Sequence, residues 1–65
     1  MAWFLRAIEQ PDGQWACSHG RVVFDHHDEL SDALEHLRDI AATVSPAELF
    51  VHRLDGGVKR VGTTE

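Results

Sequence analysis

The chain is poor in cysteine and in long apolar runs. Its 65 residues include one cysteine, Cys17, so no disulfide can form within the chain. A lone thiol is typical of proteins in a reducing compartment. No apolar run approaches the about 20 residues that span a membrane, and the first residues lack the basic stretch and apolar core of a secretory signal. We therefore expect a soluble, cytoplasmic protein with no membrane segment.

Positive charge is also scarce. Six Lys and Arg residues stand against eleven Asp and Glu residues, for a net charge of −5. The excess is concentrated in residues 25–48, which hold seven acidic residues and Arg38 alone. Nucleic-acid backbones attract concentrated positive charge, so this segment argues against nucleic acid as a partner. We interpret it as a solvated acidic face.

The chain is short enough to form only one domain, over residues 1–65. A chain of this length buries only about 60% of the surface that it exposes when unfolded. Without a disulfide, such a domain needs another support, and association with a partner can supply it.

One stretch, residues 30–44, has the periodicity of a helix. Its apolar residues recur every three or four positions, which places them on one side of a helix. They are Leu30, Ala33, Leu34, Leu37, Ile40, Ala41 and Val44. Asp28 or Ser31 can cap the start, and Pro46 ends the helix because the residue before proline avoids helical geometry.

Five other segments have the alternation and composition of short strands. They are residues 3–10, 14–19, 21–25, 48–54 and 58–61. Turn residues separate the first three and the last two, which indicates antiparallel hairpins. Residues 62–65 are expected to be a frayed tail. The predicted fold is α+β, in the order β-β-β-α-β-β, with one helix packed on one face of a single antiparallel-rich sheet.

Three motifs extend this interpretation across nearly the whole chain. They are W-F-L-R-x-x-x-Q-P-D-G-x-W-A, the D-A-L of the helix, and E-L-F-V-H-R-L-D-G near the end. Together they resemble the small bacterial proteins grouped as the domain of unknown function numbered 2188. The matching positions are Asp12, Gly13, Trp15, Asp32, Ala33, Val51, His52, Asp55 and Gly56. One departure is His26-His27, where relatives more often carry a threonine. The resemblance implies the same fold, and it implies no activity, because the family has none established.

Several strands carry apolar residues on both sides. A sheet that is wetted on one face shows clean alternation instead, and soluble monomers seldom keep a large apolar patch exposed. We therefore expect a homodimer, formed about a twofold axis through the face that the helix leaves open. The candidate interface is either Phe4, Ile8, Val23, Phe50 and Leu54, or the opposite-face set Trp3, Leu5 and Trp15.

The histidines are numerous for so short a chain. Together with the cysteine they make six potential zinc ligands: Cys17, His19, His26, His27, His36 and His52. Structural zinc sites usually use paired ligands at tight, repeated spacing, and Cys17-x-His19 has no second pair. We interpret the histidines as surface residues and expect no metal and no other cofactor. His52 faces outward if Leu49 and Val51 face the helix, and is a hydrogen-bonded core residue if Phe50 does.

None of the candidate catalytic residues has the surroundings that catalysis requires. A nucleophilic thiol needs a lowered pKa, whereas Cys17 lies in mid-strand among apolar neighbours and is expected to be a packed thiol. Asp32 and Glu35 share an exposed helix face, where paired carboxylates stay ordinary. Gly56-Gly57 lies in a hairpin and does not precede a helix, as a phosphate loop would. We expect no enzyme.

The function that remains is binding. The sequence favours a non-catalytic protein–protein interaction or self-associating domain. The alternative is a nucleic-acid-binding accessory protein that stacks bases on sheet aromatics beside basic side chains. The residues for that role are Trp3, Phe4 and Trp15, with Arg6, Arg21, Arg53, Lys59 and Arg60. An acidic mimic of nucleic acid is a third class, with only residues 25–48 to support it.

His26 and His27 form a candidate pH-sensitive pair. They lie between Asp25 and Asp28-Glu29, and nearby negative charge favours protonated imidazole. We expect the pair to take up protons more readily than free histidine.

Overall fold

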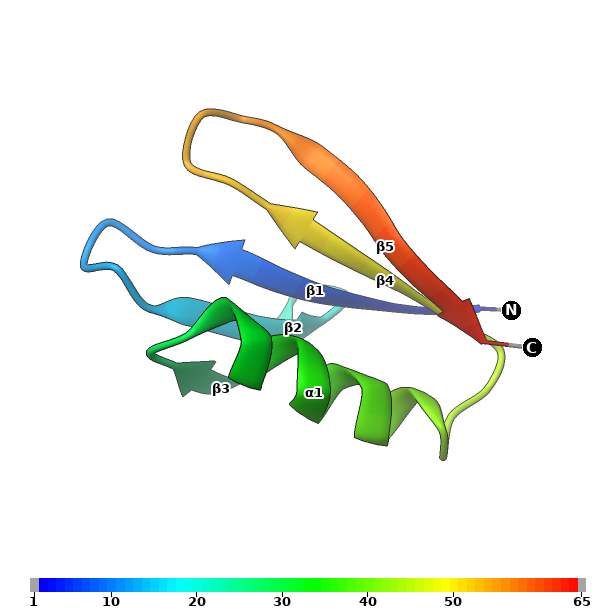
Figure 1. Cartoon of the computed structure of the whole chain (residues 1–65). Coiled ribbons are helices and arrows are strands. Elements are labelled where there is room, and N and C mark those ends of the chain that lie inside the picture. The colour runs from blue at the N-terminus through cyan, green and yellow to red at the C-terminus, as the bar shows by residue number, and fades with distance from the viewer. Residues whose placement is uncertain (1, 65) are drawn as a thin grey trace.

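A computed structural model describes residues 2–64 of the chain, and it has the predicted α+β architecture (Figure 1). The elements are β1 (Trp3–Glu9), β2 (Trp15–His19), β3 (Val22–His27), α1 (Leu30–Ala41), β4 (Ala47–His52) and β5 (Val58–Thr64). The order β-β-β-α-β-β is confirmed, and so is the single sheet with one helix on one face. Within the described residues, no helix has both the length and the apolar character that crossing a membrane requires.

The five strands lie in the order β3-β2-β1-β4-β5, with β1 at the centre. All neighbours are antiparallel except β1 and β4, which run parallel. The reason is the helix. A parallel pair needs a long crossover, and α1 carries the chain back across the sheet between β3 and β4 (Figure 1).

The core lies between α1 and one face of the sheet. Leu5 of β1 and Leu49 of β4 lie side by side in register and point to the helix. Opposite them, Ala33, Leu37 and Ala41 are fully buried on α1. Two of these helix residues are alanines, and their small side chains let the helix backbone approach the sheet closely.

This packing decides between the two candidate interface sets. Leu5 and Trp15 belong to the core under the helix, at 0% and 8% exposed. Trp3 is on the same side, and its ring stacks on that of His19 at 3.9 Å between centroids. Leu5 and Trp15 are therefore covered, whereas Trp3 stays 38% exposed at the edge of the helix face. Most of this set is thus unavailable, and the set on the other face is the better candidate.

Two edge strands contain a β-bulge. Between β2 and β3 the register shifts at Cys17/Ser18, so that Val23 pairs with Ser18 and Asp25 with Cys17. Between β4 and β5 it shifts at Leu49/Phe50. In each case one residue, Phe24 or Val61, is left without a direct partner. A bulge reverses the side-chain alternation beyond it. Each residue of β3 after Phe24 therefore faces the side of the sheet opposite to the one that simple alternation predicts.

The structure corrects the predicted end of the chain. β5 does not stop at Val61, because Gly62, Thr63 and Thr64 pair in register with β4. Thr64 also donates a hydrogen bond from Oγ1 to the carbonyl of Ala41 at 3.4 Å. The frayed tail predicted from residue 62 is wrong to this extent. Glu65 lies outside the described residues.

The predicted helix ends differ as well. The helix begins after Glu29, whose side chain makes no capping bond, so neither Asp28 nor Ser31 caps it. Asp28 instead accepts a hydrogen bond from the Gln14 side chain at 3.0 Å. At the other end the helix stops at Ala41, three residues before Val44, and irregular turns replace its last predicted turn.

Truncating Leu37 to alanine tests how much stability this core supplies. Because the side chain is fully buried, Leu37→Ala should lower the free energy of unfolding by about 2–5 kcal/mol. Glu35→Ala, on the exposed side of the same helix, should change it by less than about 0.5 kcal/mol. Urea denaturation at one fixed protein concentration measures both. Equal effects of the two substitutions would contradict this account of the core.

Candidate functional site

The sheet face away from the helix is the first candidate site, and we call it the open face. Strand register places these side chains on it: Phe4, Arg6, Ile8, Ala16, Ser18, Val23, His26, Glu48, Phe50, His52, Val58 and Arg60. Phe4, Val23 and Val58 are 41%, 50% and 59% exposed. Four of the five predicted interface residues are there. The fifth, Leu54, lies in the β4–β5 turn instead, so its place on this face is corrected.

The centre of the open face is a shallow apolar hollow of about 240 Å³. Phe4 and Phe50 line it with ring centroids 6.1 Å apart, and the other lining residues are Arg6, His52 and Val58. Next to this hollow, the side chains of β2 project little from the open face, because Ala16 and Ser18 are small and are buried between larger neighbours. The Ser18 hydroxyl makes no hydrogen bond within the described structure.

His52 lies on this face, since Leu49 and Val51 point to the helix. The outward alternative for His52 is therefore the correct one. Burial lowers the pKa of its imidazole, and the positive charge of Arg6 lowers it further. Both causes favour the neutral ring, so a second positive charge in the hollow is disfavoured.

The basic and aromatic residues proposed for nucleic-acid stacking are not brought together. Phe4 is on the open face, whereas Trp3 and Trp15 are on the helix face. Arg53 lies over the Trp15 ring, 5.6 Å from its centroid. On the open face, Arg6 donates to the Gly20 carbonyl at 3.1 Å. Arg60 pairs with Glu48 at 3.2 Å.

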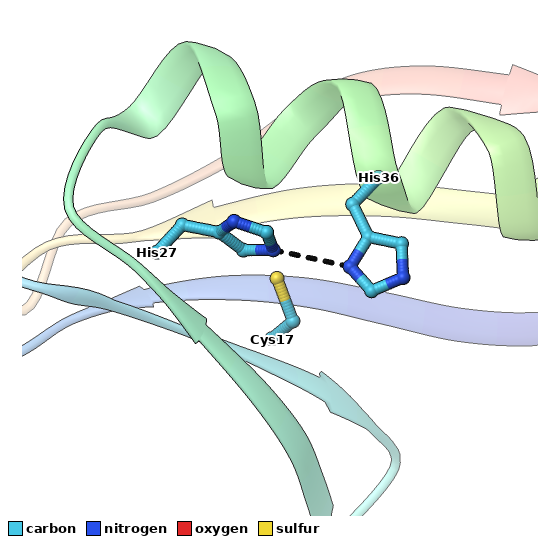
Figure 2. Close-up of side chains that lie close together, drawn as sticks. All are labelled: Cys17, His27 and His36. Carbon is cyan, nitrogen blue, oxygen red and sulfur yellow. Dashed lines mark hydrogen bonds between the residues drawn. The ribbon is translucent and has the colours of Figure 1, made fainter.

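A second candidate site lies on the other side of the sheet, where β2, β3 and the helix meet (Figure 2). We call it the helix-face cluster, and its members are Cys17, Asp25, His27 and His36. His27 Nε2 is 3.1 Å from His36 Nδ1. Asp25 Oδ2 is 3.3 Å from His27 Nε2 and 3.2 Å from His36 Nδ1. In Figure 2 the Cys17 sulfur points up to the two rings, and the three ligand atoms of Cys17, His27 and His36 all lie within 4.8 Å of one another.

The β-bulge assembles this cluster. Asp25 and His27 are two residues apart on β3, so they share a face, and Asp25 lies directly opposite Cys17. If Phe24 were paired regularly instead of forming the bulge, alternation would turn His26 to the helix in place of His27. The pair His26-His27 is thus divided. His27 joins His36 and Asp25, while His26 lies opposite Ala16 on the open face.

The electrostatics of the cluster follow from its geometry. Burial, followed by the negative charge of Asp25, raises the pKa of the Cys17 thiol to about 11. The pKa of Asp25 is held below its usual value, first by the His26 backbone N–H at 2.8 Å and then by the three nearby histidines. Cys17 is fully buried, which confirms the prediction of a packed thiol.

The remaining candidates do not form sites. His19 stacks on Trp3, and it is absent from the donor group around Cys17. Asp32, Glu35 and Asp39 line a surface hollow of about 340 Å³ next to His27 and His36. Their carboxylates add negative charge beside the helix-face cluster. Gly56-Gly57 lies in the β4–β5 turn, as predicted.

No family model, curated protein or solved structure matches the chain. The resemblance to the domain of unknown function 2188 therefore stays a prediction, as does the cytoplasmic location. The candidate sites have to be interpreted from their own geometry.

The state of Cys17 can be tested by alkylation. A pKa of about 11 leaves about 100-fold less thiolate at pH 8 than an ordinary cysteine has, and the thiolate is the reactive form. Iodoacetamide should therefore modify the folded chain at least about 100-fold more slowly than the urea-unfolded chain, with a chelator in both samples. Similar rates in the two samples would show that the thiol is accessible.

Proposed function

We propose that this protein is a small, non-catalytic interaction domain that associates with a second copy of itself through the open face. The observation that supports this most directly is the apolar hollow around Phe4 and Phe50 on a face with no covering helix. Large exposed apolar patches on small proteins mark interaction sites. The absence of a disulfide adds to the argument, because association supplies burial that a short chain lacks.

The dimensions of the sheet suit a modest interface. Five strands spaced about 4.8 Å apart and about 20 Å long present about 450 Å² on one face. Two apposed faces would bury about 900 Å², just under the about 1,000 Å² of a stable specific interface and in the range of weak or transient ones. We therefore expect dissociation constants in the micromolar range.

A second copy fits this face better than nucleic acid does. The hollow of the open face is built around two phenylalanines, Phe4 and Phe50, and the two arginines of this face are already engaged by the Gly20 carbonyl and by Glu48. A phosphate backbone would need several free cations in a row. The same patch on two chains, in contrast, is complementary to itself about a twofold axis.

The self-association can be tested with two matched phenylalanines on opposite faces. Phe4 is 41% exposed on the open face, and Phe24 is 40% exposed on the helix face. Phe4→Asp should raise the dimer dissociation constant at least about 30-fold, as loss of an interface hot spot does. Phe24→Asp should leave it unchanged. Sedimentation velocity across micromolar concentrations measures both.

Two outcomes would contradict the proposal. One is a wild-type chain that sediments as a single 7.3 kDa species at every concentration up to several hundred micromolar. The other is dissociation by Phe24→Asp with no effect of Phe4→Asp. Circular dichroism of each variant separates loss of association from loss of fold.

The pKa of His52 predicts how stability depends on pH. Its folded value lies below the ordinary 6.5, so below pH 6.5 the unfolded chain binds more protons than the folded chain. The contribution of neutral His52 to stability is therefore present above pH 6.5 and is lost as the pH falls toward the folded pKa. Thermal unfolding of wild type and His52→Gln between pH 5 and 8 should give curves that diverge in this window. Parallel curves would contradict the assignment.

A further inference from the structure

We propose that the helix-face cluster is a zinc site with four ligands drawn from β2, β3 and α1: Cys17, Asp25, His27 and His36. This differs from the expectation based on spacing, which considered only ligands that are close in sequence. The site is on the opposite side of the sheet from the open face, so it does not depend on the proposed self-association.

The distances between the donor atoms match those of a zinc site. Ligands about 2.0–2.1 Å from zinc at tetrahedral angles lie about 3.3–3.4 Å from one another. Asp25 Oδ2, His27 Nε2 and His36 Nδ1 form a nearly equilateral triangle with sides of 3.1, 3.2 and 3.3 Å. The Cys17 sulfur lies within 4.8 Å of both imidazole donors and faces them in Figure 2. Asp25 is outside the group whose donor atoms are all that close, so the sulfur and the Asp25 carboxylate would move toward each other to complete a tetrahedron around the ion.

Hydrogen bonds alone do not satisfy this triangle. A neutral imidazole carries one N–H, and a carboxylate has none. Each N–H can point at only one of its two neighbours, so at least one side of the triangle brings two lone pairs or two N–H groups together. A cation at the centre would accept a lone pair from all three atoms at once.

The ligand types select the metal. One thiolate, two imidazoles and one carboxylate suit zinc and its spectroscopic substitute cobalt(II), whereas magnesium and calcium prefer oxygen ligands alone. Binding requires the thiol to lose its proton, as in other cysteine-containing zinc sites.

The surroundings also favour a cation. The side chains of His27, His36 and Asp25 are 24%, 35% and 42% exposed, so an ion can reach the cluster from solvent. The adjoining hollow is lined by Asp32, Glu35 and Asp39. These carboxylates make the local potential negative, which concentrates divalent cations.

A metal ion bound at this site would act as a structural cross-link. It would join the edge strand β3 to β2 and to the helix, in a chain with no disulfide. Small domains commonly rely on a metal for this purpose, and the free energy of binding then adds to that of folding.

Cobalt(II) and zinc titrations of the chelator-treated, refolded chain test the proposal. We expect one cobalt per chain, with the d–d bands of tetrahedral coordination and a thiolate-to-cobalt charge-transfer band that zinc abolishes. Zinc at about a hundredfold above its dissociation constant should raise the unfolding temperature by about 10 °C or more. His27→Gln and His36→Gln should weaken binding at least about 100-fold.

His26→Gln is the matched control, because His26 adjoins His27 but is on the other face. It should bind cobalt as the wild type does, and so should Phe4→Asp, which separates this test from that of self-association. The proposal is overturned if the spectrum lacks the charge-transfer band, if one metal binds per two chains, or if His26→Gln weakens binding as much as His27→Gln. The charge-transfer band reports on Cys17 in the wild type, so the result does not depend on a foldable cysteine variant.

Discussion

The close packing of α1 against the sheet, above all against the central strand β1, is the contact on which the rest of the structure depends. Leu37 is fully buried in the same core as Leu5 and Leu49, and the small side chains of Ala33 and Ala41 allow the helix to lie close to the sheet. Since the chain has a single helix in its described part, this contact also decides which face of the sheet stays uncovered. The same position of the helix brings His36 beside β3. Both candidate sites therefore follow from one packing arrangement.

Periodicity in the sequence was sufficient to predict the elements and their order. The apolar stripe of residues 30–44 identified the helix, and the alternation in residues 3–10 and 48–54 identified the two central strands. Local signals were less reliable at the ends. Asp28 has the chemistry of a helix cap, but its side chain is engaged by Gln14 across the fold. The polar residues Thr63 and Thr64 have the composition of a disordered tail, but they pair with the edge of β4 and extend β5.

The helix-face cluster was beyond sequence reasoning for a specific reason. Its members come from three elements, and their meeting depends on a register shift of one residue at Phe24. No propensity in the sequence marks that bulge. The alternation of Asp25 and His27 does predict that they share a face, and this was the one signal available. The existence of an open apolar face, in contrast, was predictable from strand alternation, because apolar residues occur on both sides of β1 and β4. Which of the two residue sets lies on that face was left open until the position of the helix was known.

The two bulges have a consequence for how copies of the chain can meet. Both lie in the pairs that involve the outermost strands, β3 and β5. An edge strand with a straight row of unpaired N–H and C=O groups is a template for further strands, and a bulge twists that row out of line. Growth of the sheet from either side into a fibre is thereby discouraged. Under the proposed self-association, contact through the open face would then end at two molecules, because each copy would cover the open face of the other.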